Sequence, residues 1–177
     1  MRVPVVTSLL CATAILALGV ALDAQPRQRA SPHEKAQATV DGASISIEYG
    51  RPYVKGRDIF GGLVPYGQVW RTGADEATTL VTDATLVFGG LTVPPGTYTL
   101  YTLPGEKDWS LIVNKKTGQW GTQYSQADDL GRVPMQVSKL DSPVEQLTID
   151  VSDTAAGGEL QIRWATTRAV APFTVKK

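Results

Sequence analysis

The segment ATVDGASISIEY (residues 38–49) carries the clearest fold signal in this chain. Ile45, Ile47 and Tyr49 alternate with polar residues, and this period of two places them on one face of a half-buried β-strand. The dipeptide Asp-Gly at 41–42 comes just before that strand and is typical of a two-residue hairpin turn. The segment therefore predicts two antiparallel strands, the second packed against a core through one face.

Similar segments recur along the chain at 78–81, 85–88, 97–103, 109–114, 133–139, 144–151, 159–165 and 169–175. Turns rich in Gly, Pro and Asp separate them, and no segment has a convincing amphipathic helix pattern. Trp109 and Trp164 occupy inward-facing strand positions and are predicted to lie in the core. Pro172 is typical of an edge strand, because proline cannot donate to a ladder. We expect an all-β protein, either an antiparallel β-sandwich or a jelly-roll-like barrel.

Two segments between the predicted strands are too long and irregular to be turns. Residues 51–79, RPYVKGRDIFGGLVPYGQVWRTGADEATT, are rich in glycine and proline, which permit or impose changes of chain direction. Residues 115–132 have no clean period either, although one helical turn is expected near 125–130. We interpret both segments as long ordered loops, and such loops frequently carry function.

Length and composition bound the domain organisation. The chain has 177 residues, which suffice for one domain. Residues 1–24 combine Arg2, an apolar run and small residues, the pattern of a signal peptide; a retained membrane anchor is the alternative. Residues 25–35 are polar and predict a flexible linker, which leaves 36–177 for the β-sandwich. We expect an exported protein, periplasmic or extracellular, with no membrane contact after signal removal.

Charge and cysteine content exclude several classes of function. Seventeen basic and seventeen acidic residues cancel, so nucleic acid is not an expected partner. Cys11, the only cysteine, lies in the predicted signal peptide, which leaves the mature chain without a disulfide or a thiol nucleophile. His33 is the only histidine, and no nucleotide-binding or metal-binding motif occurs. We therefore expect neither a metal site nor a cofactor.

The strongest candidate constellation is WRTGADE, residues 70–76. Arg71 could bind an anionic group, while Asp75 and Glu76 could hold a polar ligand or a hard cation, or act as acid and base. Arg71 could equally pair with one of these carboxylates and hold the loop in place. Both interpretations remain open from the sequence.

Tyr53 and Arg57 belong to a second group in the same loop. Together with Arg51 and Lys55 they would form a basic, aromatic ridge along an extended backbone, which suits an anionic or sugar ligand. Long basic side chains more often cover apolar surface and stay solvated, and that interpretation is favoured here.

Three residues outside this loop complete the set of candidates. Trp120 and Tyr124 could stack on sugar rings or a partner's apolar surface, or could form a lid over one end of the sandwich. His33 in SPHEK is expected to be an exposed linker histidine rather than a base or ligand, although Glu34 is adjacent.

Three of these segments together resemble a known bacterial family. The segments that carry the resemblance are residues 51–79, VPPGTYTLYTLPGEKDWSLIVNK at 93–115 and QWGTQY at 119–124. The chain resembles the family catalogued as domain of unknown function 2911, both in the sequence of these segments and in their order. The resemblance covers about residues 31–175 and implies an exported single-domain protein; it carries over no activity, substrate or catalytic residue. That family often has Asn at the position of Asp75, which implies a hydrogen-bonding or structural group there rather than a general base.

We therefore expect a non-catalytic exported binding module whose ligand is a glycan, a peptide or another envelope component. The residues expected to bind it are Tyr53, Arg57, Arg71, Asp75, Glu76 and Trp120. One alternative is a hydrolase or lyase with Glu76 as acid or base and Arg71 as electrostatic stabiliser, although the missing set of nucleophile and base argues against it. Another alternative is a structural envelope protein.

Overall fold

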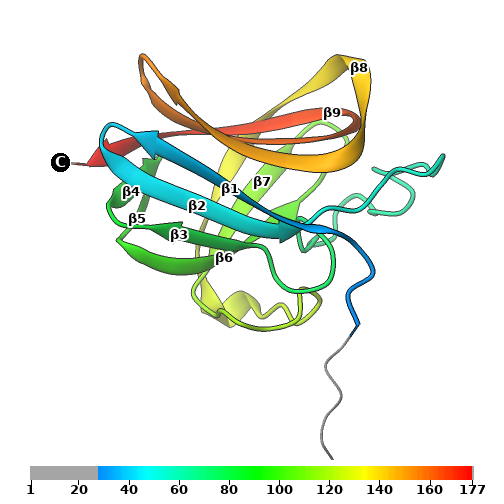
Figure 1. Cartoon of the computed structure of the whole chain (residues 1–177), viewed down its shortest axis with the longest axis horizontal. Coiled ribbons are helices and arrows are strands. Elements are labelled where there is room, and N and C mark those ends of the chain that lie inside the picture. Colours follow the sequence, from blue (N-terminus) through cyan, green and yellow to red (C-terminus); the bar gives the residue numbers. More distant parts are fainter. Residues whose placement is uncertain (1–27, 177) are drawn as a thin grey trace, which may run out of the picture.

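The computed structural model describes residues 28–176, which form one nine-stranded antiparallel β-sheet (Figure 1). In chain order the strands are β1 (His33–Val40), β2 (Ala43–Gly50), β3 (Thr79–Thr82), β4 (Thr85–Phe88), β5 (Leu91–Val93), β6 (Gly96–Leu103), β7 (Trp109–Asn114), β8 (Asp129–Thr154) and β9 (Gly157–Lys176). One short 3₁₀ helix, η1 (Gln126–Asp128), lies in the second long loop. The all-β prediction and the single predicted helical turn are both confirmed. The predicted signal peptide, 1–24, lies outside the described residues.

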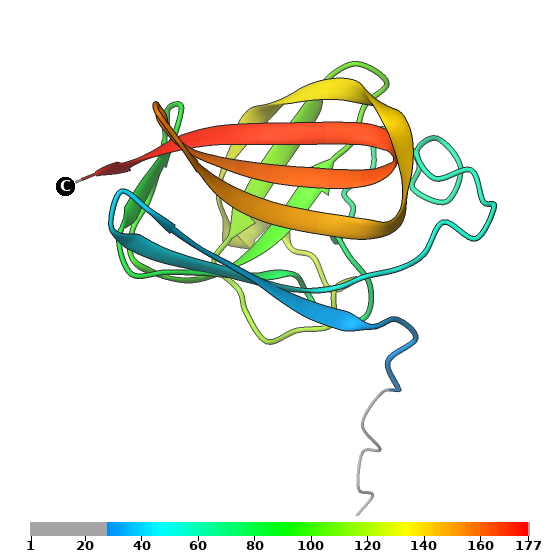
Figure 2. The ribbon, with the colours of Figure 1, turned by 45° about the horizontal axis from the view of Figure 1, so that its top comes forward.

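The sheet folds over on itself to make two layers. Its strand order is β1-β2-β3-β6-β7-β8-β9-β4-β5. β8 pairs with β7 through residues 129–135 and with β9 through residues 136–154, so this one strand passes from the first layer into the second. The β8–β9 hairpin consequently lies over β1 and β2 (Figures 1 and 2). Because β1 and β5 remain at the two ends of the order, the arrangement is sandwich-like and is not a closed barrel.

The hairpin predicted from residues 38–49 is present as β1 and β2. Val40 pairs with Ala43, so the connection is the dipeptide at 41–42 alone. Asp41 has φ = 47° and Gly42 has φ = 85°. Positive φ at both central residues is the mark of a type I′ turn, whose twist matches that of the two strands.

The predicted inward faces form the core between the layers. Ile45, Ile47 and Tyr49 of β2 are at most 2% exposed. Trp109 of β7 and Trp164 of β9 are also buried, as predicted. The ring of Phe60, from the first long loop, packs edge-on against both tryptophans, with centroid distances of 4.7 Å to Trp109 and 6.1 Å to Trp164. The long loop thus contributes to the core as well as to the surface.

Several predicted boundaries differ from the structure. The segments at 159–165 and 169–175 are parts of one strand, β9, which lies between β8 and β4 and is not an edge strand. Pro172 is tolerated because it falls between the residues that pair with β8, up to Val170, and those that pair with β4, from Thr174. β1 begins at His33, so the last residues assigned to the linker belong to the first strand.

A line of hydrogen bonds joins the end of β2 to β8; we call it the β2–β8 seam (residues 49–54 and 145–149). The amide of Val54 donates to the carbonyl of Glu145 over 2.7 Å, and the amide of Leu147 donates to that of Pro52 over 3.0 Å. The amide of Ile149 donates to the hydroxyl of Tyr49 over 2.9 Å. The seam fixes the start of the first long loop to the opposite layer.

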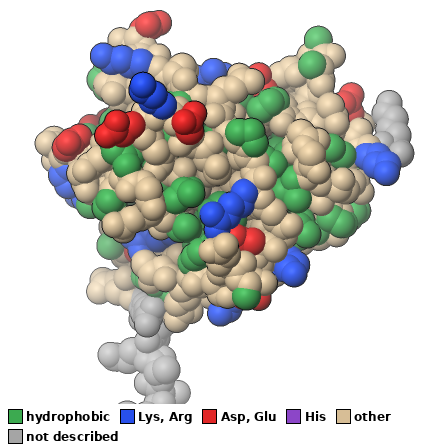
Figure 3. All heavy atoms as spheres, turned by 180° about the vertical axis from the view of Figure 1, so that it is seen from behind, with side chains coloured by type: hydrophobic (Ala, Val, Ile, Leu, Met, Phe, Trp, Pro, Cys, Tyr) green, Lys and Arg blue, Asp and Glu red, His purple; other side chains and the backbone are tan. Residues whose placement is uncertain are grey.

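The surface carries mixed charges. In Figure 3, acidic and basic side chains are interspersed with hydrophobic ones over the face that is shown. Within residues 28–176, no helix is long and apolar enough to cross a membrane.

The seam yields a prediction about stability. Tyr49→Phe removes the hydroxyl that accepts from Ile149 and leaves a buried amide without that acceptor. We expect a loss of roughly 1 to 3 kcal/mol in the free energy of unfolding, measured by urea denaturation. Tyr66→Phe is the matched control, because Tyr66 is 40% exposed, and it should change stability little. Equal effects of the two substitutions would contradict the role given to Tyr49.

Candidate functional site

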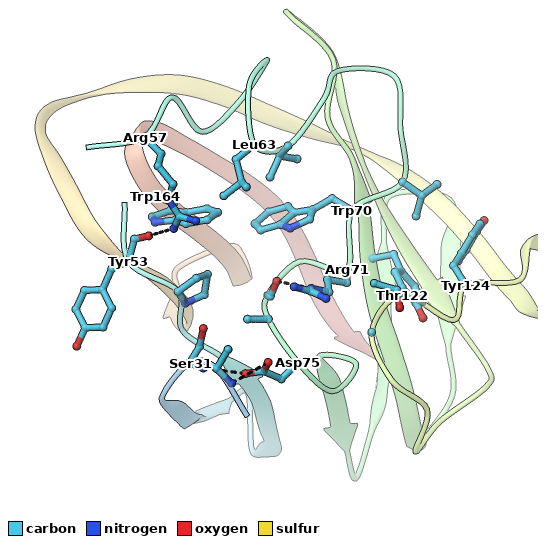
Figure 4. A pocket seen from close by; sticks show the side chains of 18 of the residues that line it. Ser31, Tyr53, Arg57, Leu63, Trp70, Arg71, Asp75, Thr122, Tyr124 and Trp164 are labelled. Carbon is cyan, nitrogen blue, oxygen red and sulfur yellow. Dashed lines mark hydrogen bonds between the residues drawn. The ribbon is translucent and has the colours of Figure 1, made fainter. Parts of the chain in front are cut away.

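The two long loops and the segment before β1 meet around a pocket of about 590 Å³ (Figure 4). The first long loop contributes most of the lining, from Pro52 to Asp75. The second loop contributes Gly121, Thr122 and Tyr124, and Ala30 and Ser31 close one side. A volume of this size lies in the range of small-molecule sites.

Two tryptophans form an aromatic wall of the pocket. The rings of Trp70 and Trp164 are stacked, with centroids 5.7 Å apart and an interplanar angle of 14°. Trp70 is held by two backbone hydrogen bonds to Thr102 of β6, and Phe60 packs edge-on against it at 5.6 Å. The indole Nε1 of Trp164 is buried and has no hydrogen-bond partner among residues 28–176. The wall is therefore rigid, and it includes one donor that no described residue uses.

The rim of the pocket is apolar and unusually exposed. Leu63 is 48% exposed and Tyr53 is 38% exposed, and both line the pocket. Tyr66, from the same loop, is 40% exposed. Large apolar side chains that gather in the open beside a cavity are typical of a binding surface.

Arg71 is fixed in the pocket but is not neutralised there. Its Nε donates to the carbonyl of Gly73 over 3.1 Å, and its side chain is partly buried. A Cβ at Gly121 would lie 2.7 Å from Cδ of Arg71, so the absence of a side chain at 121 makes room for the arginine. In the described part of the chain, Nη1 and Nη2 of Arg71 have no hydrogen-bond or ion-pair partner. The guanidinium therefore presents both terminal nitrogens without an internal acceptor.

Asp75 binds the segment before β1 rather than Arg71. Its Oδ1 accepts from the amide of Ala30 over 3.1 Å, and its Oδ2 accepts from the amide of Ser31 over 3.0 Å. Figure 4 shows its carboxylate directed toward Ser31. The residue has φ = 64°, a conformation that Asp and Asn adopt more readily than most residues. Asp75 is thus a structural clamp that builds one side of the pocket.

Glu76 is paired outside the pocket. Its Oε1 accepts from Nε of Arg29 over 2.9 Å, and its Oε2 lies 3.2 Å from Nε2 of His33. Partial burial alone would raise the pKa of the Glu76 carboxyl, but the hydrogen bond from Arg29 and the neighbouring positive charges outweigh it and lower the pKa. Glu76 therefore stays ionised at neutral pH.

His33 differs from the prediction. It was expected to be an exposed linker residue, but its side chain is only 13% exposed and lies 3.6 Å from Oδ2 of Asp75 as well as beside Glu76. The cause is that His33 begins β1 and pairs with Gly50 of β2, while the clamp at Asp75 holds the residues just before it. Even so, among residues 28–176 no group of three or more His, Cys, Asp or Glu side chains is placed to hold a metal ion.

Two further cations stand at the mouth of the pocket. Arg57 donates from Nε to the carbonyl of Val54 over 3.0 Å and from Nη2 to that of Tyr53. Lys55 lies 5.9 Å from the centre of the Tyr53 ring. The charged residues that line the pocket are therefore three cations and the already clamped Asp75.

Tyr124 and Tyr101 form the wall on the side of the second loop. Their rings meet edge-on with centroids 4.9 Å apart. The Tyr124 hydroxyl donates to Asp129 over 2.7 Å and accepts from Arg132 over 2.7 Å. Partial burial and the bond to Asp129 raise the pKa of Tyr124. This hydroxyl is consequently engaged within the protein and acts as part of the wall.

The structure brings together four of the six residues expected to bind a ligand. Tyr53, Arg57, Arg71 and Asp75 line the pocket, whereas Glu76 and Trp120 do not. Trp120 instead forms an isolated β-bridge with Glu76.

Sequence reasoning did not assign Trp70, Trp164 or Leu63 to the site. The strand pattern of Trp164 indicated only burial, and it is indeed buried; nothing local shows that its ring also borders a cavity. For Trp70 the available signal was its place at the start of the constellation WRTGADE, residues 70–76.

Comparisons with known proteins identify a family and nothing closer. Searches of curated proteins and of solved structures each found no match. A family model described as "Protein of unknown function (DUF2911)" matches residues 31–173, which is most of the chain. The protein therefore belongs to this family of unknown function.

Proposed function

We propose that the protein is a non-catalytic binding module, exported from the cell, that holds a small ligand in the pocket between its two long loops. The ligand is a glycan, a peptide or another envelope component that offers an apolar face. The observation that carries this proposal is the stacked Trp70–Trp164 pair in the wall of a 590 Å³ pocket. Aromatic walls with a few polar groups are typical of ligand sites.

The exposed rim strengthens the proposal. Leu63 and Tyr53 contribute little to the stability of the fold, because much of their apolar area stays in contact with water. A ligand seated on Trp70 would cover Leu63, which lies beside that ring in Figure 4. Arg71 supplies two terminal nitrogens that have no partner elsewhere in the described chain.

The enzyme alternative has weaker support. A hydrolase or lyase acting through Glu76 needs that carboxyl within reach of the substrate, but Glu76 does not line the pocket and is paired with Arg29. Its lowered pKa also suits a fixed anion better than a general acid. The alternative of a structural envelope protein leaves the apolar rim unexplained.

The first prediction from this proposed function concerns the rim. A thermal-shift screen of the purified protein against short glycans, short peptides and other envelope components should yield a ligand that raises the Tm. Leu63→Asp should weaken that ligand about tenfold or more, because it replaces apolar contact area by a charge. Val81→Asp is the matched control, since Val81 is 42% exposed on β3 and away from the pocket; it should leave affinity unchanged.

A screen without any stabilising ligand would count against the proposal. Equal losses of affinity from Leu63→Asp and Val81→Asp would show that the bound compound does not occupy this pocket.

The second prediction tests the clamp. Asp75→Ala should destabilise the protein by roughly 2 kcal/mol or more, because it removes two acceptors and places alanine at positive φ. Asp75→Asn keeps one acceptor and a tolerant side chain, so its effect should be smaller. Urea denaturation gives the stabilities, and hydrogen exchange at residues 30 and 31 reports the docked segment. Equal effects of both variants would contradict the clamp.

The third prediction concerns catalysis. Any activity found with panels of glycosides and esters should persist in Glu76→Gln, because this carboxyl does not reach the pocket. A loss of at least a hundredfold in kcat, with folding intact, would favour the hydrolase or lyase alternative.

A further inference from the structure

The unpaired guanidinium of Arg71 indicates which chemical class of ligand the pocket takes. This inference rests on the proposed function and concerns the same site. A cation with two unused donors beside an apolar wall selects a ligand that combines one anionic group with an apolar body.

The backbone around Arg71 holds the guanidinium ready for a ligand. Trp70, just before it, is paired with Thr102 by two backbone hydrogen bonds of 2.7 and 3.0 Å. Thr72, just after it, has φ = 55°, and its hydroxyl donates to the carbonyl of Trp70 over 3.2 Å. The bond from Nε to Gly73 then fixes the plane of the guanidinium. Little side-chain freedom remains to be lost when an anion binds.

The carboxylates that could have neutralised Arg71 are both engaged elsewhere. Asp75 accepts two amides from the segment before β1, and Glu76 pairs with Arg29. The remaining charged residues of the lining, Lys55 and Arg57, are cations. An anion that enters the pocket thus meets a net positive lining.

The donors of Arg71 fit one carboxylate. Its Nε is already bound to Gly73, so Nη1 and Nη2, each with two N–H groups, remain as neighbouring donor atoms at the end of the side chain. A planar carboxylate accepts two parallel N–H bonds from such an end. Arg57, the other guanidinium of the lining, lies on the far side of the pocket in Figure 4 and is turned to the carbonyls of Tyr53 and Val54. A dianionic phosphate would lack a second cation beside Arg71.

The apolar part of the ligand has a defined place. Figure 4 shows the Trp70 ring between Leu63 and Arg71, with Thr122 on the other side of the arginine. A ligand whose carboxylate meets Arg71 therefore lays its body along Trp70 toward the rim at Leu63.

We propose that the pocket binds monocarboxylates with an apolar or aromatic body, with the carboxylate held by Nη1 and Nη2 of Arg71 and the body on Trp70. Two sources share this chemistry: a free organic acid, and the C-terminal carboxylate of a peptide with an apolar last residue.

Matched pairs of probes test this proposal by isothermal titration calorimetry on the purified protein. The first pair is N-acetylphenylalanine and its neutral amide, which differ only in the carboxylate. The second pair is Gly-Gly-Phe and Gly-Gly-Phe amide, which represents a peptide end. We expect each acid that binds to bind about tenfold or more tightly than its amide, as a charge-assisted hydrogen-bonded pair implies. Binding of the tripeptide acid alone identifies a peptide end as the source; binding of both acids identifies the free acid as sufficient.

Variants then assign the preference to Arg71. Arg71→Gln should abolish the difference between acid and amide while the affinity for the amide stays the same. Arg168→Gln is the matched control and should retain the difference, because Arg168 does not line the pocket and pairs with Glu159 on β9. Arg71→Lys keeps the charge but not the paired donors and should retain only part of the difference, so it also serves if Arg71→Gln does not fold.

The failures can be told apart. Equal binding of acid and amide to the wild-type protein overturns the carboxylate assignment and leaves the pocket as a binding site. An acid preference that survives Arg71→Gln overturns the role of Arg71. Absence of binding by all four probes, together with an empty screen for rim-dependent ligands, overturns both the assignment and the proposed function.

Discussion

The β2–β8 seam is the constraint on which the rest of the structure depends. Residues 49–54 run along residues 145–149, so that backbone groups at the end of one layer are satisfied by the other layer. Arg51 adds to the seam by donating from Nε to the carbonyl of Leu147 over 2.9 Å. A buried backbone amide needs a partner, and the amide of Ile149 finds one in the hydroxyl of Tyr49, 100 residues earlier in the chain. The seam fixes where the first long loop starts, and hence where Tyr53 and Arg57 stand.

Charged residues that are close together in the sequence have different roles at the site. Asp75 and Glu76 hold the segment before β1 through its amides and Arg29, and Glu76 also lies beside His33 of β1. Arg71, only four residues before Asp75, lines the pocket without a carboxylate partner in the described chain. The pairing of Arg71 with one of these carboxylates, which the sequence allowed, is therefore absent from the described structure, and the ligand role of Arg71 stays a prediction. The carboxylates hold the chain in place, and the arginine does not take part in that hold.

Local patterns predicted the fold better than they predicted the site. Alternation at 45–49 and the Asp-Gly turn depend on neighbours in the sequence, so they could be read directly. The continuity of β9 through Pro172 could not be predicted in this way, because it depends on which strand pairs with β9 on each side of the proline. The placement of Trp164 beside Trp70 likewise results from the folding over of the sheet. His33 was misjudged because its partners, Asp75 and Glu76, are distant in the sequence.

The docking of residues 29–31 against Asp75 and Glu76 determines where a tag or a surface can be attached without disturbing the pocket. Ala30 and Ser31 line the pocket itself, so an affinity tag or a fusion partner attached just before this segment would stand beside the pocket. The end of β9 lies at the opposite end of the molecule from the first long loop (Figures 1 and 2). Tethering through the C-terminus to a sensor chip or a bead would leave the pocket facing the solution.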